Sequence, residues 1–409
     1  MLKKHAGPTR TKRAAAADAS RRAIIEILKM RRDPALVLWS LFMLLDPIYI
    51  FKSGLPQPGD FLAILLLPFA LSGWYAPGRL SRQGARAVRA LSWFVVYATL
   101  NALIWSMLED GWVLNLKYGF VMSAIYYIFD MIVFLAVLVM YEKYQERFIR
   151  LTVNLVLVSV VIQTLMTFVY TRESTLRSSG LFNTPNQLGY FAILASAIVL
   201  LGQRKLSMST MQVVVGQLCS CYLALLSASK AALVSVALLV MIAAINRFKM
   251  LLAIAAVASF FLFISNPFES AMERSQQRIT ADQSLGFFEE RGYDRIVDDP
   301  QYLIFGAGEG AYIRYEFTSR IKAHELHSSI GTLIFCYGFI GTLLFFNFLW
   351  QVARGGNFRR FLLLIPPAAY GLTHQGLRFT LLWIMFAVVV MLNDVDSRTR
   401  MRKRIQRNS

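Results

Sequence analysis

Charged residues are scarce in this 409-residue chain: they make up 16% of it, against 56% hydrophobic residues, and the mean hydropathy is +0.49. Soluble domains carry about 25% charged residues, so the composition excludes an ordinary soluble protein. Cysteine is almost lacking, since Cys219, Cys221 and Cys336 are the only three. All three fall in apolar segments, and we expect neither a disulfide framework nor a cysteine metal site. No internal repeat is visible, which weighs against repeat-built transporters.

Long apolar runs are what the sequence has instead. A helix needs roughly 20 mainly apolar residues to cross a bilayer, and the runs predict an all-α integral membrane protein with about twelve transmembrane helices. Nine of them are expected within 35–266 and three within 327–393. The predicted spans are 35–51, 60–76, 88–107, 119–141, 151–170, 187–203, 210–227, 231–246, 250–266, 328–351, 361–373 and 377–393.

The basic residues predict the orientation. Lys and Arg number 43 against 24 Asp and Glu, a net charge of +19. Most of them fall in the N-terminal segment 1–34, in the tail 394–409 and in the connections on the same side of the predicted bundle. By the positive-inside rule both basic ends are cytoplasmic, which explains the charge without a nucleic-acid partner. Within 1–34, the stretch 21–32 is expected to be an interfacial helix, with a mitochondrial presequence as the alternative.

The longest connection, 267–326, is expected on the opposite side of the membrane. Residues 266–326 hold 11 acidic and 7 basic residues, so this loop is acidic in a basic protein. A connection of this length is usually functional or disordered. Its many Phe and Tyr residues favour a loop that folds back onto the helices and carries the chemistry.

A first polar motif precedes the predicted helix 187–203. Thr184, Pro185 and Gln187 form a capping-box pattern with proline at the first helical position. A helix N-terminus suits anions, and Arg177 just upstream is able to grip a phosphate group with its fork of N–H donors. The alternative is a well-capped helix with a solvated arginine.

A second motif lies in the long loop. Arg291 and Arg295 are spaced for one face of a helical turn. Gly306, Gly308 and Gly310 follow, and permit close approach of a ligand to the backbone, although they do not form a dinucleotide-binding pattern. In the alternative interpretation, neighbouring aspartates simply neutralise the two arginines.

A third motif, His324-Glu-Leu-His327-Ser-Ser, opens the predicted span 328–351. It lacks the spacing of a zinc protease site. The positive end of a helix dipole favours the neutral form of a histidine placed there, and a neutral imidazole is able to accept a proton. The alternative is an interfacial histidine that only caps the span.

Lys230 and Arg378 add cations in outer turns. Asp130 is an intramembrane carboxylate, with either a functional role or a structural hydrogen bond.

Together these residues resemble the signature of a known family. His327-Ser-Ser with Gly338 and Gly341 downstream, the Asn183-Thr-Pro-Asn186 stretch after Arg177, and Ser-Ala-Ser-Lys230 are similar to motifs of the bacterial O-antigen ligase and O-antigen polymerase superfamily. Two positions depart from its pattern. Lys230 stands where the family usually has Arg, and Ser328 where it more often has Asn.

The resemblance implies a metal-independent, inverting glycosyltransferase without a cofactor, in the bacterial inner membrane, with its site facing the periplasm. The donor would be an undecaprenyl-pyrophosphate-linked oligosaccharide, and the acceptor a glycan or lipid-linked glycan. A surface-polysaccharide polymerase is the leading expectation, since the motifs at 291–295 and 306–310 look more like that branch. The alternatives are an O-antigen ligase that transfers the glycan to lipid A–core, and a non-enzymatic transporter or flippase. Inner-membrane lipids, a flippase and a chain-length regulator are the expected partners.

Carried onto this chain, the resemblance assigns roles residue by residue. His327 is the expected catalytic base, and Arg177, Arg291 and Arg295 are expected to bind the donor pyrophosphate. The expected supporting residues are Asn183, Asn186, Lys230, Gly306, Gly308, Gly310, His324 and Arg378.

Overall fold

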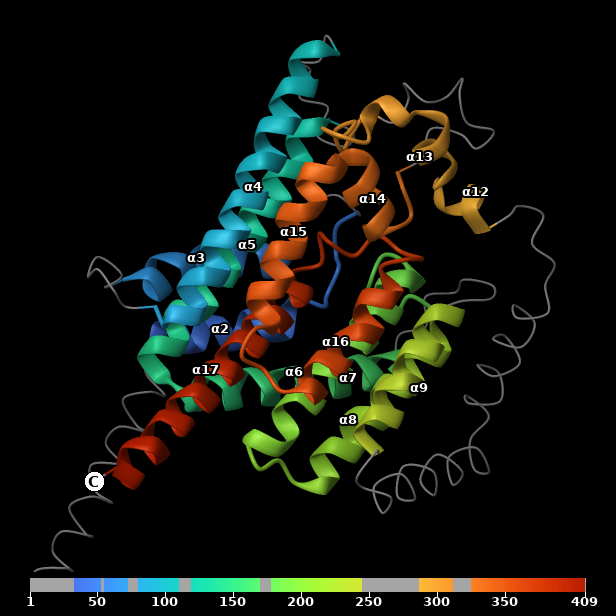
Figure 1. Ribbon diagram of the computed structural model, residues 1–409. Helices are drawn as coiled ribbons and strands as arrows, with labels where there is room; N and C mark the ends of the chain where they lie inside the picture. The colour runs from blue at the N-terminus through green and yellow to red at the C-terminus, as the bar shows by residue number, and fades with distance from the viewer. Residues whose placement is uncertain are drawn as a thin grey trace, which may run out of the picture.

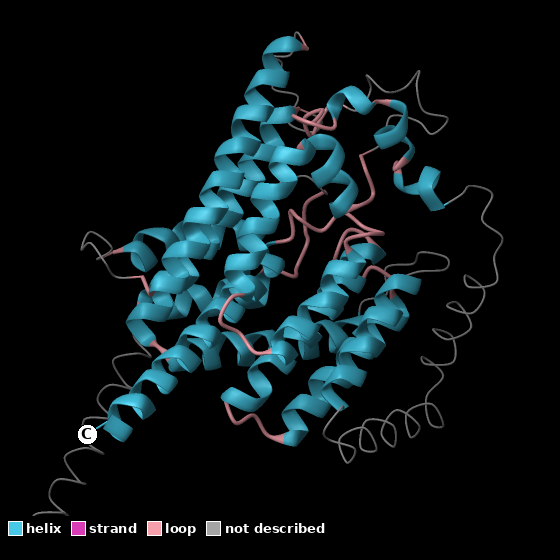
Figure 2. Ribbon diagram, in the orientation of Figure 1, coloured by secondary structure: helices cyan, strands magenta, loops and turns pink. Residues whose placement is uncertain are grey.

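The computed structural model describes residues 33–52, 55–72, 80–109, 119–169, 178–244, 287–311 and 325–408. All regular structure in these ranges is helical, as Figures 1 and 2 show. The longer helices are α2 (Pro34–Leu45), α3 (Pro58–Leu71), α4 (Arg82–Leu108), α5 (Phe120–Tyr144), α6 (Glu146–Val169), α7 (Pro185–Lys205), α8 (Thr210–Leu226), α9 (Lys230–Ala244), α14 (Ser329–Cys336), α15 (Gly338–Ala353), α16 (Phe358–Tyr370) and α17 (Thr380–Asn408). The expected interfacial helix at 21–32 and the expected span 250–266 lie outside the described residues.

The length and apolar composition of the described helices fit a membrane protein. Five of those described are long and apolar enough to cross a bilayer: α4, α5, α6, α7 and α17. Five others, α2, α3, α8, α9 and α15, are apolar but shorter. The apolar runs of the sequence therefore predicted where helices form, because a helix satisfies every backbone polar group within its own segment, as a lipid environment requires.

Two predicted boundaries are wrong. The expected single span 328–351 is two helices, α14 and α15, which meet at Tyr337 and Gly338. Gly338 has φ +62°, a conformation that no α-helix contains and that glycine adopts without strain. At the C-terminus, α17 does not end near residue 393. It continues as one helix through the expected tail 394–409, up to Asn408.

Helices α7 and α17 form the centre of the bundle. In each, 83% of the most apolar stretch is buried within the protein. Helix α7 packs against α6, α8, α9 and α16, whereas α4, α5 and α15 form a second group on the other side of α17. Buried aromatic side chains fill the contacts, with Trp383 of α17 edge-on to Phe345 and Tyr127.

The bundle has two chemically different ends. Helices α12 (Phe287–Arg291) and α13 (Asp294–Asp298) lie at one end, which we call the loop end, together with the start of α14. At the other end α17 runs out of the bundle to the C-terminus. We call this the basic end, because the exposed last turns of α17 carry six Lys and Arg residues between 398 and 407.

Candidate functional site

The glycine loop, residues 306–310, is built into the loop end. Two side chains of α4, Tyr97 through its hydroxyl and Asn101 through Nδ2, donate hydrogen bonds of 2.7 and 2.8 Å to the carbonyl of Phe305. The indole N–H of Trp105 donates to the carbonyl of Gly306 at 3.0 Å. The loop is thus held along its backbone by one long helix.

The three glycines are required by close packing. Gly306, Gly308 and Gly310 have φ of +83°, +75° and +152°. A Cβ at Gly306 would collide with the carbonyl oxygen of Cys336, and one at Gly308 would lie 2.7 Å from the Trp105 ring. The glycines allow other parts of the protein to approach closely, whereas the close approach of a ligand to this backbone stays a prediction. In the structure they position the loop against α4 and against the junction of α14 and α15.

Glu309 is the polar centre of this loop and is 1% exposed. Its carboxylate accepts hydrogen bonds from the hydroxyls of Tyr127 (2.9 Å) and Tyr337 (2.5 Å) and from Nε2 of Gln375 (3.1 Å). It also forms an ion pair with Arg378. A buried charge is tolerated only when it is paired and hydrogen-bonded, and Glu309 meets both conditions.

Arg378 connects Glu309 to the segment that carries His327. Its Nη1 lies 2.9 Å from Oε1 of Glu325, and its guanidinium stacks over the Tyr126 ring at 5.4 Å. Burial raises the pKa of Glu325, and the Arg378 charge opposes that rise. Arg378, expected as a supporting residue, is therefore the partner of two carboxylates, and its role in this geometry is to hold two loops together.

The start of α14 is tied to the turn between α16 and α17. The Ser328 hydroxyl caps α14, accepting from the Gly331 N–H at 2.9 Å, and donates to the carbonyl of Gly371 at 3.0 Å. The Ser329 hydroxyl donates to the His374 carbonyl at 3.0 Å and accepts from the Gly376 N–H at 2.9 Å. Both serines of the His327-Ser-Ser motif are thereby fixed.

Tyr293 brings the loop segment onto the same place. Its hydroxyl lies 2.6 Å from the Ser328 hydroxyl and donates to the Leu372 carbonyl at 2.8 Å. The described part of the long connection therefore folds back onto the helices, as its aromatic residues predicted.

Arg291 reaches the α16–α17 turn. Its Nη1 lies 3.5 Å from Nδ1 of His374, and its Nη2 lies 3.4 Å from the Glu290 carboxylate. The His374 ring in turn packs on Tyr370, with the ring centroids 4.5 Å apart. A cation from the loop thus stands beside an imidazole from the bundle.

The spacing of Arg291 and Arg295 predicts that they share one helical turn. The structure shows instead that they belong to two different helices. Helix α12 ends at Arg291, Gly292 follows with φ +75°, and Arg295 belongs to α13. Arg295 is 4% exposed. A Cβ placed at Gly292 would lie 3.9 Å from its guanidinium carbon, so Arg295 packs under the bend between the two helices. Burial raises the pKa of Asp294, and the Arg295 charge opposes that rise.

His327 itself is exposed, in the bend just before α14. It directly precedes Ser328, which is fully buried, so its backbone is held while its side chain faces outward. Arg177 and His324, the other expected residues of the site, lie outside the described residues.

The predicted capping box of α7 is confirmed. The Thr184 hydroxyl accepts from the Gln187 N–H at 3.3 Å, and the Gln187 side chain accepts from the Thr184 N–H at 3.1 Å. Asn183 Nδ2 donates to the Phe51 carbonyl at 2.9 Å, and the Asn186 carbonyl accepts from the Tyr370 hydroxyl at 2.9 Å.

The remaining two singled-out residues, Lys230 and Asp130, differ in their burial. Lys230 is exposed at the first position of α9. Asp130 is 1% exposed and lies within α5, one turn beyond Tyr127.

Sequence reasoning missed several residues of this cluster. Glu309, Tyr293, Gln375, Tyr127 and Tyr337 were not singled out as site residues. One signal was available for Glu309, because it is the only charged residue among 305–310. The tyrosines carry no comparable signal, since aromatic residues make up 13% of this chain.

The described residues contain no group of three or more His, Cys, Asp or Glu side chains placed to hold a metal ion. The loop end has three groups that could act on a substrate. They are the exposed imidazole of His327 on its fixed backbone, the guanidinium of Arg291, which reaches the bundle, and the imidazole of His374 beside it. The chain matches no protein-family model, no curated protein and no solved structure.

Proposed function

We propose that this chain is a bacterial surface-polysaccharide polymerase of the O-antigen polymerase and ligase type. It transfers an undecaprenyl-pyrophosphate-linked oligosaccharide to a sugar hydroxyl at the periplasmic face of the inner membrane. The observation that carries the proposal is the convergence of Arg291, Tyr293, His374 and the His327-Ser-Ser motif at one end of an apolar helical bundle. A donor with a lipid tail and a charged, sugar-bearing head fits such a boundary.

The proposed topology has twelve membrane-crossing helices, both termini in the cytoplasm and residues 267–326 in the periplasm. The charge distribution supports it. The exposed Lys and Arg of α17 lie at the basic end, where the positive-inside rule places the cytoplasm. Helix α17 rises by roughly 24 Å between Thr380 and Asp396, which is most of the hydrocarbon thickness.

In the proposed reaction, the acceptor hydroxyl oxygen attacks the anomeric carbon of the donor sugar. His327 accepts the hydroxyl proton. The bond between the anomeric carbon and the pyrophosphate oxygen breaks, and the electron pair leaves with the lipid pyrophosphate. Attack from the side opposite the leaving group inverts the configuration.

The departing pyrophosphate needs cations aimed at its oxygens. Arg291 is the best placed of the three proposed arginines, because it reaches the α16–α17 turn beside His374. Arg295 supports the bend that presents Arg291, and Arg177 is proposed to complete the group from the segment before α7. The protein thereby supplies the charge that a metal supplies in other transferases.

The direct test uses the purified full-length protein in detergent with a lipid-linked oligosaccharide and a chelator. Release of lipid pyrophosphate with formation of a longer glycan supports the polymerase. A transporter or flippase has no chemical step and would give neither product. Release that occurs only when lipid A–core is added would identify a ligase and overturn the polymerase assignment.

A further inference from the structure

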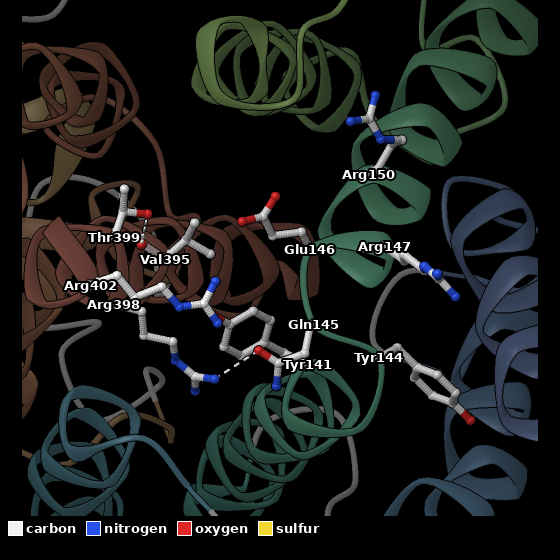
Figure 3. Close-up of a pocket in the computed structure, with 10 residues that line it drawn as sticks. All are labelled: Tyr141, Tyr144, Gln145, Glu146, Arg147, Arg150, Val395, Arg398, Thr399 and Arg402. Atoms are coloured by element: carbon white, nitrogen blue, oxygen red, sulfur yellow. Dashed lines mark hydrogen bonds between the residues drawn. The ribbon is translucent and has the colours of Figure 1, made fainter. Parts of the chain in front are cut away.

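A pocket of about 460 Å³ at the basic end marks the place where α2 begins. It lies between the turn joining α5 to α6 and helix α17, and Figure 3 shows Arg147 and Arg150 on α6 pointing away from Arg402 on α17. Because these cations diverge, they do not form one binding site. Tyr144, which also lines the pocket, donates a hydrogen bond to the carboxylate of Asp33, the residue that caps α2. Helix α2 therefore starts at the basic end.

From there the chain does not cross the bundle as one helix. Helix α2 ends at Leu45, after a rise of roughly 18 Å, and α3 begins at Pro58. Between them, residues 46–52 and 55–57 are non-helical, and we call these residues the excursion. An extended chain covers up to about 3.3 Å per residue, so residues 46–52 are long enough to reach the opposite end of the bundle.

The excursion does reach the loop end. Nδ2 of Asn183 donates a hydrogen bond of 2.9 Å to the carbonyl of Phe51, and Asn183 lies two residues before α7 begins at Pro185. Helix α7 rises by roughly 30 Å from Pro185 to Lys205, and Lys205 forms an ion pair with Asp396 at the basic end. Phe51 thus lies about one hydrocarbon thickness away from the basic end.

The backbone of the excursion is held by buried amide side chains. Gln57 accepts from the Phe51 N–H at 3.0 Å and donates to the carbonyls of Phe51 and Leu55 at 3.1 and 2.9 Å. Nε2 of Gln163 on α6 donates to the Pro47 carbonyl at 2.6 Å. Irregular backbone at membrane depth is tolerated only when its polar groups find such partners. The excursion is therefore a stable part of the fold that suits apolar surroundings.

The tip of the excursion exposes apolar side chains. Ile50, Phe51 and Leu55 are 66%, 45% and 51% exposed. Lys52 is exposed beside them and is the only charged residue among 47–57. Turns mostly carry Gly, Pro and small polar residues, whereas large apolar side chains exposed in one place mark a binding surface. An apolar ligand that ends in a negative charge fits this composition.

The tip is connected to the candidate site through the first turn of α7. Asn183, which binds the Phe51 carbonyl, lies three residues before Asn186. The Asn186 carbonyl accepts from the Tyr370 hydroxyl at 2.9 Å, and Tyr370 packs on His374 in the candidate site. The proposed donor has its pyrophosphate at that site, so its isoprenoid chain has to leave along an apolar surface next to it.

We propose that the tip of the excursion binds the isoprenoid chain of the lipid-linked donor next to its pyrophosphate. Ile50, Phe51 and Leu55 contact the chain, and Lys52 adds a positive charge for the pyrophosphate. This binding rests on the proposed function, because the chain belongs to the same donor. A bilayer phospholipid also joins apolar chains to a phosphate, and the test below separates the two.

The test is the donor KM of purified full-length I50A/L55A, with I64A/L65A as the matched control. The control removes the same two kinds of side chain from α3, where Ile64 and Leu65 are 56% and 53% exposed. One lost CH₂ contact is worth about fourfold in affinity, so I50A/L55A should raise KM about tenfold. Its kcat should stay unchanged, because the chain is bound equally in the ground state and the transition state. The control should stay within about twofold of the wild type.

Undecaprenyl phosphate, which carries no glycan, gives a second readout that needs no transfer. A ligand that binds only the folded state raises the melting temperature. We expect this shift for the wild type and for I64A/L65A, whereas I50A/L55A should need about tenfold more lipid for the same shift. Phosphatidylglycerol at the same concentration should give no such shift. If I50A/L55A does not fold, I50A takes its place and should need about threefold more.

The outcomes separate this site from the reaction. Equal KM values for I50A/L55A and I64A/L65A, in a protein whose wild type transfers glycan, would overturn the binding at the tip and leave the proposed function standing. Equal shifts with phosphatidylglycerol and undecaprenyl phosphate would overturn it as well, because the tip would then contact bulk lipid. A wild type that binds undecaprenyl phosphate through the tip but transfers no glycan would support the lipid site and overturn the proposed function.

Discussion

The carboxylate of Glu309 holds several segments of the loop end together. Its carboxylate receives two tyrosine hydroxyls, one amide and one guanidinium, and these donors come from α5, from the junction of α14 and α15, and from the α16–α17 turn. A carboxylate is able to accept all of them because its two oxygens offer about four lone-pair sites. One acidic side chain therefore joins segments that are distant in the sequence.

Glu309→Ala is expected to destabilise the protein strongly. Removing one partner of a buried ion pair leaves the other charge uncompensated and costs about 3–5 kcal/mol; Glu325 still pairs with Arg378, so we expect the lower end. The matched control is Glu290→Ala, whose half-buried carboxylate lies 3.4 Å from Arg291 and should cost less than about 1 kcal/mol. Thermal unfolding in detergent measures both. Equal melting temperatures for the two variants would contradict a structural role of Glu309.

Arg291→Ala is expected to lower the transfer rate about ten- to a hundredfold, because one charge-assisted hydrogen bond to the pyrophosphate is worth about 1.5–3 kcal/mol. Arg291→Lys should recover only part of the rate, since the planar fork of donors is lost. Arg354→Ala, an exposed arginine at the basic end, is the control and should transfer normally. Normal transfer by Arg291→Ala at normal protein levels would mean that this arginine is structural.

At the scale of elements, the break between α14 and α15 is the feature that the sequence did not reveal. A glycine inside an apolar run costs only about 1 kcal/mol in a helix, so Gly338 alone does not predict an interruption. The interruption is stabilised from outside, because the Phe339 N–H donates to the Leu303 carbonyl at 2.7 Å and the Gly308 N–H donates to the Cys336 carbonyl at 2.9 Å. The spacing of apolar residues along the chain does not predict long-range hydrogen bonds of this kind.

Gly338→Ala is expected to destabilise the protein more than Gly355→Ala. Both glycines have positive φ, +62° and +81°, so both variants place an alanine in a strained backbone conformation. A Cβ at Gly338 would also lie 2.5 Å from the backbone nitrogen of Gly306, whereas at Gly355 the nearest atom is a Gln83 side-chain oxygen at 3.8 Å. Melting temperatures of the two variants measure the difference. Equal decreases would show that the glycine loop does not pack on this break.

At the scale of the whole molecule, composition predicted the helical bundle well. Expected spans such as 210–227 and 119–141 correspond to α8 and α5 within a few residues. The contacts of the candidate site were less predictable. The His327-Ser-Ser motif singles out Ser328 and Ser329. Their hydrogen-bond partners within 371–376 depend on helix packing, which the sequence alone does not specify.

The topology gives a prediction for the whole chain. A reporter enzyme that works only outside the cytoplasm, fused after Gln283, should be active in cells, because the proposed topology places the loop 267–326 in the periplasm. The same reporter fused after Gly355, in the connection between α15 and α16, should be silent and serves as the control. The reverse pattern would invert the bundle and place the proposed site in the cytoplasm.

The most direct test of the account is the transfer rate of His327→Ala, measured with purified protein and a lipid-linked donor. General-base assistance is worth about 10²–10⁴ in rate, so His327→Ala should lose at least a hundredfold in transfer while donor binding stays close to that of the wild type. His324→Ala is the control and should lose far less. Equal and mild defects in the two variants would contradict the account and assign proton acceptance to another group, with Glu325 and His374 the nearest candidates.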